Sequence, residues 1–214
     1  MKTEESELSI FDALLSQRAV RHFRSDAVPT PVIESILYYA TRAPSGGNRQ
    51  PWEFVVVTDP VQRTRLGDIY RQCSKQLFEA RLSSSTDDGS RYVYRDALYL
   101  SDHMAEAPVL IVVCARVPEG QTLERQSPSI YPAVQNILLA ARGHGLGSVL
   151  TDAHKQAEDT VRALLGLPNG VETVCIVPIG YPVDAHRAFR PVHSRRPLAE
   201  VLHWDRFDPS VSDR

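Results

Sequence analysis

The chain has 214 residues, a formal net charge of −2 and 43% hydrophobic residues, which suits one globular domain with a substantial core. This charge balance gives no reason to expect nucleic acid or an anionic membrane as a partner. No apolar run approaches the ~20 residues that a membrane span requires, and the acidic residues 1–7 lack the pattern of a signal peptide. Cys73, Cys114 and Cys175 lie far apart without a C-x-x-C pair, and the last two fall in apolar runs. We therefore expect inert core thiols and a soluble, cytoplasmic protein.

The spacing of apolar residues predicts helices and strands interleaved along the chain. The expected elements are helices over 8–16 and 31–42, a strand over 53–58, a helix over 61–82, an unstructured stretch over 83–90, a strand over 109–115, a polar loop over 119–127, a helix over 130–144, a short strand over 148–151, a helix over 155–165 and a strand over 171–180. Thr30 is expected to cap the second helix, because Pro31 suits its first turn. This order predicts an α+β domain with a mixed sheet between helices.

Two segments have unusual composition. The helix predicted over 130–144 has few polar residues to face solvent, so we expect it in the core or at a subunit interface. From Tyr181 onward, prolines and arginines replace the apolar pattern, and such a segment must wrap over another surface. The expected organisation is one domain over 8–205, with an extended arm over 181–205, a flexible tail over 1–7 and a second tail over 206–214.

A polar loop over residues 43–52 is the best candidate for ligand contact. Its two glycines allow the backbone to approach a ligand closely, and prolines near both ends limit its relaxation. Asn48 and Gln50 each offer a hydrogen-bond donor and an acceptor. This composition favours a rigid cradle for a planar, hydrogen-bonding ligand. An ordinary turn rich in turn-forming residues is the alternative.

The common catalytic motifs are missing from the sequence. Gly143, Gly145 and Gly147 close a helix and precede a strand, which reverses the strand-to-helix order of a dinucleotide-binding loop. The seven histidines show no metal-like spacing, and no P-loop, nucleophile elbow or H-E-x-x-H motif occurs. A metalloenzyme or a triad hydrolase is therefore not expected.

The arginines suggest an anion site instead. Arg18 and Arg21 near the start of the chain, with Arg195 and Arg196 near its end, could converge on one phosphate. Arginine suits this role because its planar fork makes short, charge-assisted hydrogen bonds. Scattered surface charge is the alternative.

These segments, in this order, resemble the FMN-dependent nitroreductase family. The similar segments are Arg18-Ala19-Val20-Arg21-His22-Phe23, residues 43–54, residues 130–136, residues 145–151, and residues 178–182 leading to 195–198. The resemblance covers residues 8–205 and implies a nitroreductase-like fold with tightly bound, non-covalent FMN. It also implies an intertwined homodimer whose site lies between the subunits. The helix over 130–144 would then lie in the interface, and the arm over 181–205 would wrap the neighbouring subunit.

Carried over residue by residue, the resemblance implies a set of cofactor contacts. They are Arg18, the backbone of Ala19, Arg21 and Arg195 at the phosphate and ribityl chain; Pro44, Ser45, Gly46 and Asn48 along the flavin and ribityl side, with Gln50 nearby; and Leu150 and Thr151 beside the isoalloxazine ring. The family usually has a basic residue where Gln17 stands and a serine where Ala19 stands. Both departures would weaken the phosphate contacts slightly. The related flavin destructases carry an aspartate in place of Ala19, which argues against that activity.

The resemblance implies no catalytic acid, base or nucleophile, since the flavin carries the redox chemistry. NADH or NADPH and a small aromatic acceptor, such as a nitroaromatic or a quinone, would take turns in one pocket in a ping-pong hydride-transfer cycle. Tyrosines in the region 83–99 could influence acceptor choice, or they could simply pack the helix. A reductive dehalogenase or enone reductase on the same scaffold is one alternative. A flavin carrier or sensor without turnover is another.

Overall fold

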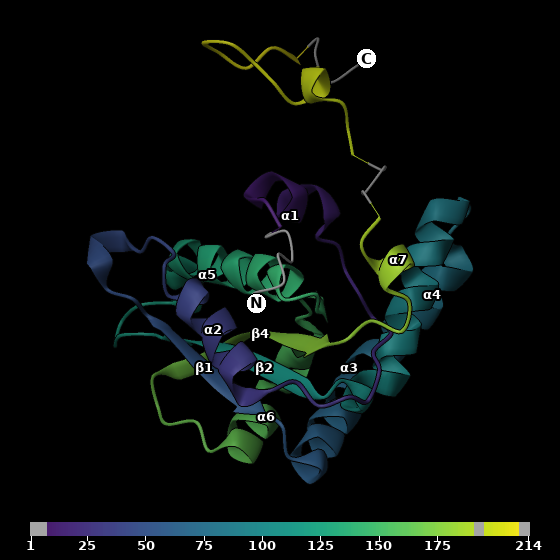
Figure 1. Cartoon of the computed structure of the whole chain (residues 1–214). Coiled ribbons are helices and arrows are strands. Elements are labelled where there is room, and N and C mark those ends of the chain that lie inside the picture. Colours follow the sequence, from purple (N-terminus) through teal and green to yellow (C-terminus); the bar gives the residue numbers. More distant parts are fainter. Residues whose placement is uncertain (1–7, 191–194, 210–214) are drawn as a thin grey trace, which may run out of the picture.

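The computed structural model of the chain describes residues 8–190 and 195–209. Its centre is a sheet that lies between two layers of helices (Figure 1). The strands are β1 (Trp52–Val57), β2 (Val109–Arg116), β3 (Gly147–Ser148) and β4 (Val171–Gly180). They lie in the order β1-β2-β4-β3, and each neighbouring pair is antiparallel.

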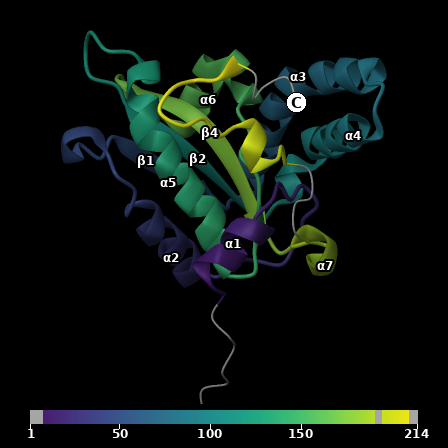
Figure 2. The same ribbon diagram turned by 90° about the horizontal axis from the view of Figure 1, so that it is seen from above.

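Helices cover both faces of this sheet. They are α1 (Ile10–Ser16), α2 (Thr30–Ala40), α3 (Pro60–Ser84), α4 (Asp88–His103), α5 (Leu123–Gly143), α6 (Glu158–Leu165) and α7 (Ala185–Ala188), with short 3-10 turns η1 (Gly46–Asn48), η2 (Met104–Glu106), η3 (Ala153–Ala157) and η4 (Leu198–Glu200). Viewed from above, α5 runs beside α2 along the sheet, with α1 lying against it (Figure 2). No helix in the described ranges is long and apolar enough to span a bilayer.

The alternation of side chains along β2 creates the two cores. Val109, Ile111 and Val113 pack with α2 and α5 on one face, while Leu110 and Val112 pack with α3, α4 and α6 on the other. All five of these residues are buried because both faces of the strand are covered. The prediction of a central, fully apolar strand is confirmed.

Several predicted boundaries are wrong for local reasons. α3 runs to Ser84, and Asp87 caps α4 by accepting a hydrogen bond from the N–H of Ser90, so only 85–87 of the stretch expected to be unstructured over 83–90 lie outside helices. The predicted polar loop over 119–127 ends earlier, because α5 begins at Leu123. Thr30 lies inside α2, whose N-cap position is Pro29.

The sheet is also less mixed than predicted. Within the part of the chain that the structure describes, its strands pair only in the antiparallel sense, and one parallel bridge joins Ala19 to Ser148. By contrast, α6 ends as expected at Gly166, which adopts a left-handed conformation (φ +65°).

The last described segment of the chain lies away from the rest of the fold. Residues 195–209 stand apart from the sheet and its helices (Figure 1). Residues 1–7 and 210–214, which belong to the predicted tails, lie outside the described residues, as do 191–194 of the predicted arm.

Candidate functional site

The segment after α1 carries the arginines of the predicted phosphate site along the edge of the sheet. Ala19 bridges to Ser148 of β3, and the N–H of Val20 donates to the carbonyl oxygen of Ser148 (3.0 Å). Gly147 permits this close approach, because a Cβ there would lie 2.5 Å from Cγ1 of Val20. The N–H of Ala19 has no hydrogen-bond acceptor in the described part of the chain. The segment is thus fixed to the sheet while one backbone donor stays available.

A cavity of about 150 Å³ lies between this segment, α4 and α7. Its charged lining residues are Arg18, Arg21, Arg187, Asp96 and Asp184. Asp96 lies 3.4 Å, through its Oδ1, from Nε2 of His22. Counting arginines and aspartates, the lining carries one positive charge in excess. A cavity with this lining favours an anion.

Arg21 is the least compensated of these arginines. It is half-buried, and burial lowers the pKa of its guanidinium, although the Asp96 carboxylate opposes that shift. No hydrogen bond or ion pair joins the Arg21 guanidinium to another residue in the described ranges. Arg18 makes one long contact, from Nη1 to the carbonyl oxygen of Arg187 (3.5 Å). Both guanidinium groups therefore keep donors for a ligand.

Sequence reasoning missed Arg187 as a member of this cavity. Nη2 of Arg187 donates to the hydroxyl of Tyr92 on α4 (2.8 Å). A local signal was available, since Asp184 stands three residues before Arg187 and caps α7 by accepting from its N–H (2.9 Å). That signal places a helix start, and it does not place the helix beside the cavity.

The loop over 43–52 folds on itself as a polar turn. Ser45 Oγ accepts from the N–H of Gln50 (3.0 Å), and Nε2 of Gln50 donates to Oδ1 of Asn48 (3.1 Å). Asn48 and Gln50 have φ angles of +53° and +49°, a left-handed conformation that is uncommon outside glycine. Gly46 donates its N–H to Oγ of Ser129 on α5 (3.2 Å). The loop is thus anchored to α5 and largely exposed, and its role as a ligand cradle stays a prediction.

A single chain does not bring the loop to the arginine cavity. Figures 1 and 2 place the loop between α2 and β1 on the opposite side of the chain from α7. The predicted residues therefore form two separate groups. Pro44, Ser45, Gly46, Asn48 and Gln50 lie in the loop, and Arg18, Ala19 and Arg21 line the cavity.

Leu150 and Thr151 follow β3. Leu150 packs against the core formed by α2 and α5. Thr151 is buried, pairs through its backbone with Ile176, and donates its hydroxyl to the Tyr70 hydroxyl (2.6 Å). The donors of Thr151 are therefore used inside the protein, so it would contact a ligand mainly by packing.

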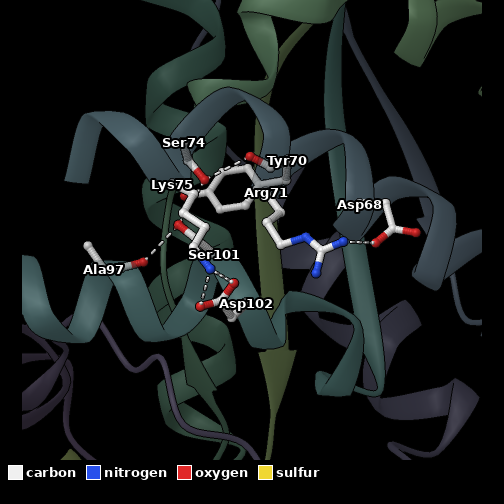
Figure 3. A network of polar contacts seen from close by, with 8 residues as sticks. All are labelled: Asp68, Tyr70, Arg71, Ser74, Lys75, Ala97, Ser101 and Asp102. Atoms are coloured by element: carbon white, nitrogen blue, oxygen red, sulfur yellow. Dashed lines mark hydrogen bonds and ion pairs between the residues drawn. The ribbon is translucent and has the colours of Figure 1, made fainter. Parts of the chain in front are cut away.

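Tyr70 belongs to the polar seam between α3 and α4 (Figure 3). One turn further along α3, Oγ of Ser74 lies within hydrogen-bond distance of the carbonyl oxygen of Tyr70 (2.7 Å) and of Oγ of Ser101 (2.8 Å). Beside them, Nζ of Lys75 binds Asp102 (3.0 Å). This seam joins the two helices at a fixed spacing and connects them to Thr151.

The arm arginines do not reach the cavity within one chain. Arg195 lies exposed on the segment 195–209, which stands apart from the body (Figure 1). Arg196 donates instead to the carbonyl oxygen of Glu200 in the same segment (2.8 Å).

Two further observations concern possible metal ligands and the cysteine thiols. The described residues contain no group of three or more His, Cys, Asp and Glu that could hold a metal ion. Cys114 and Cys175 are buried. Burial raises the pKa of the Cys114 thiol to about 12, and it raises the pKa of the Cys175 thiol as well. The prediction of inert core thiols is confirmed.

The fold is α+β, and its candidate site is a cavity lined by three arginines and two aspartates. The model of the Nitroreductase family matches residues 14–181, and the chain belongs to this family. It is thus a nitroreductase-family oxidoreductase, and the resemblance stated from its motifs is confirmed.

Its relatives carry different names. Iodotyrosine deiodinase of Nematostella vectensis is 27% identical over 211 residues, covering 94% of this chain and 76% of that protein. NADH dehydrogenase of Thermus thermophilus is 28% identical over 237 residues, covering 94% of this chain and 99% of that one. These two relatives have different names at nearly the same identity, so sequence similarity alone does not identify the substrate.

The solved structures agree on the fold. A variant of the FMN and NADPH-dependent nitroreductase NfnB from sphigopyxis sp. strain HMH is 25% identical, with a TM-score of 0.71, covering 94% of this chain and 100% of that one. Oxidized iodotyrosine deiodinase bound to FMN and 3-iodo-L-tyrosine is 24% identical, with a TM-score of 0.74, covering 93% of this chain and 100% of that one. The predicted α+β, nitroreductase-like fold is confirmed.

Proposed function

We propose that this chain is an FMN-dependent oxidoreductase that uses NADH or NADPH to reduce small aromatic acceptors such as nitroaromatics and quinones. Family membership supports the reaction class. The observation that carries the cofactor assignment is the cavity in which Arg18 and Arg21 keep unpaired donors beside the free N–H of Ala19.

The residues present fit FMN. A phosphate group accepts charge-assisted hydrogen bonds from guanidinium and backbone N–H donors, which the cavity offers. The loop residues Ser45, Asn48 and Gln50 offer the polar atoms that the ribityl chain and ring edge require. Bound FMN would supply the redox chemistry, and the side chains would bind it, orient it and shape the acceptor pocket.

We further propose a homodimer, because the two groups of site residues lie on opposite sides of one chain. A second copy would bring its loop to the arginine cavity. Exposed apolar side chains support such an interface: they include Phe11 (74%) and Leu15 (64%) on α1, and Trp204 (78%) and Phe207 (69%) on the C-terminal segment. A groove of about 580 Å³ between α1, α2 and α5 offers that segment of the partner a place to dock. The free cysteines fit a cytoplasmic location.

An absorbance spectrum of the purified protein, followed by anaerobic titration, tests the proposal. We expect a yellow protein whose flavin band is bleached by NADH or NADPH and restored by a nitroaromatic or a quinone. A yellow protein that neither nucleotide bleaches would be a carrier or sensor, contrary to the proposal. A colourless protein that takes up no added FMN would refute the cofactor assignment.

Reductive dehalogenation is the second candidate. It is supported by the relatives named iodotyrosine deiodinase and by the solved structure that contains 3-iodo-L-tyrosine. Anaerobic assays with the dithionite-reduced enzyme separate the two candidates. Release of iodide from an iodophenol or iodotyrosine faster than consumption of a nitroaromatic would favour dehalogenation.

A further inference from the structure

Arg187 lines the cavity and forms no ion pair with a described residue, although its pKa is raised, first by its hydrogen bond to Tyr92 and more weakly by the nearby carboxylates of Asp96 and Asp184. Its guanidinium donates to the hydroxyl of Tyr92 (2.8 Å), and its Cζ lies 5.3 Å from the centroid of that ring. Asp184, the nearest carboxylate in sequence, accepts from the backbone N–H of Arg187 at the start of α7. Since a guanidinium carries five N–H donors, most donors of Arg187 remain for a ligand.

Three elements hold Arg187 at the cavity. Nη1 of Arg18 contacts its carbonyl oxygen (3.5 Å), Asp184 caps its helix, and Tyr92 holds its side chain from α4. Arg187 therefore stands between the segment that carries Arg18 and Arg21 and the helix that carries Tyr92. All of these residues belong to one chain, so the contacts of Arg187 do not depend on the proposed dimer.

The charge balance of the lining depends on Arg187. With it, the arginines of the cavity outnumber the aspartates by one, and without it they are equal in number. The lining would then attract a dianion less strongly, because its formal charge would fall from +1 to zero. Arg18 and Arg21 alone would be offset by Asp96 and Asp184.

We propose that Arg187 is a further phosphate-binding residue of this chain, beside Arg18 and Arg21, and that Tyr92 positions it. This inference rests on the proposed function and adds α7 and α4 to the phosphate site. Its consequence is specificity: the cavity would favour FMN over riboflavin, which lacks the phosphate. It also gives Tyr92 a role in cofactor binding that is separate from any contact with the acceptor.

The test compares the dissociation constants of FMN and riboflavin for the flavin-stripped protein, measured by quenching of flavin fluorescence. For Arg187→Gln we expect FMN to bind about tenfold more weakly, the lower end for a charged hydrogen bond because Arg187 is exposed. Riboflavin binding should change less than about twofold. Tyr92→Phe should weaken FMN binding about threefold, and Arg187→Lys should restore part of the loss. Arg190→Gln is the matched control, since Arg190 is exposed on the same segment but does not line the cavity.

The outcomes separate this inference from the proposed function. If Arg187→Gln leaves the ratio of FMN to riboflavin affinity unchanged while Arg21→Gln lowers it, Arg187 is not a phosphate ligand and the proposed cofactor site stands. Equal losses for both flavins in Arg187→Gln would mean a purely structural role and would also overturn the inference. If Arg21→Gln changes neither constant, the phosphate assignment of the proposed function fails.

Discussion

Replacing Arg21 by glutamine should separate cofactor binding from folding. Arg21 lines the cavity with donors that no described residue accepts, so its loss removes a charged hydrogen-bonding partner of the phosphate. Such a partner contributes about 1.5–3 kcal/mol, which corresponds to a roughly 10–150-fold weaker dissociation constant for FMN.

The stability of the flavin-free protein should move differently. Burial lowers the pKa of the Arg21 guanidinium, which means that the folded chain disfavours its charge. Removing that charge should leave the melting temperature of the flavin-free variant unchanged or higher. FMN at 100 times the wild-type dissociation constant stabilises the wild type by about 2.7 kcal/mol, and the same concentration should stabilise the variant by only about 0.3–1.4 kcal/mol.

Isothermal titration with FMN and thermal unfolding with and without FMN measure both effects. Arg24→Gln is the control, because Arg24 is exposed and already paired with Asp26 (2.8 Å). A variant at Arg21 that keeps its FMN dissociation constant within twofold of the wild type would refute the reasoning. So would an equal loss of riboflavin affinity.

Three other predictions concern the scaffold. Gly147→Ala should destabilise the protein by about 1–3 kcal/mol, because the added Cβ collides with a neighbouring side chain, whereas Gly143→Ala meets nothing within 4 Å; thermal unfolding of both variants compares them. Burial lowers the pKa of His154 to about 4, so about 3 kcal/mol of stability should be lost as pH falls from about 6.5 to 4. The variant His154→Asn should show a weaker dependence of the unfolding free energy on pH, measured by urea titrations. A thiol reagent should modify only Cys73 in the folded protein, since the other cysteines are buried.

Each of these predictions has a contrary result. Equal melting temperatures for the two glycine variants would remove the argument for close packing of β3. Glu158, whose pKa is lowered, loses its own contribution only as pH falls below its ordinary value of 4.5, so a slope confined to that range would exclude His154 as the source. Reaction of a second thiol per folded chain would contradict the burial of Cys114 and Cys175.

Much of the fold could be read from the sequence because its signals are local. The apolar run of β2 needs two covered faces, and Gly166 ends α6 through its own backbone conformation. An apolar run does not show whether its strand pairs in the parallel or the antiparallel sense. The prediction of a mixed sheet was therefore wrong, and the named strands pair antiparallel. The cap that Asp87 supplies to α4 outweighed the loop-like composition around it.

In the candidate site too, local features could be predicted from the sequence and long-range contacts could not. The arginine segment and the polar loop were found from residue types and order. Arg187 was missed because it meets Arg18 across 169 residues of sequence, and periodicity carries no information about such a contact. Residue patterns alone do not show that the loop and the cavity are separated in one chain, since this depends on where α2 and α7 pack; the family resemblance implied it by placing the site between two subunits.

The hydrogen bond from Val20 to Ser148 gives the arginine segment the dynamics of a strand. Arg18 and Arg21 flank a residue that is buried against Gly147, so they move with the sheet edge and not as a free loop. Local opening of this edge would displace both guanidinium groups at once. Exchange of the Val20 amide hydrogen with deuterium therefore reports how often this edge of the proposed phosphate pocket opens. Frequent opening would shorten the time for which a ligand stays bound.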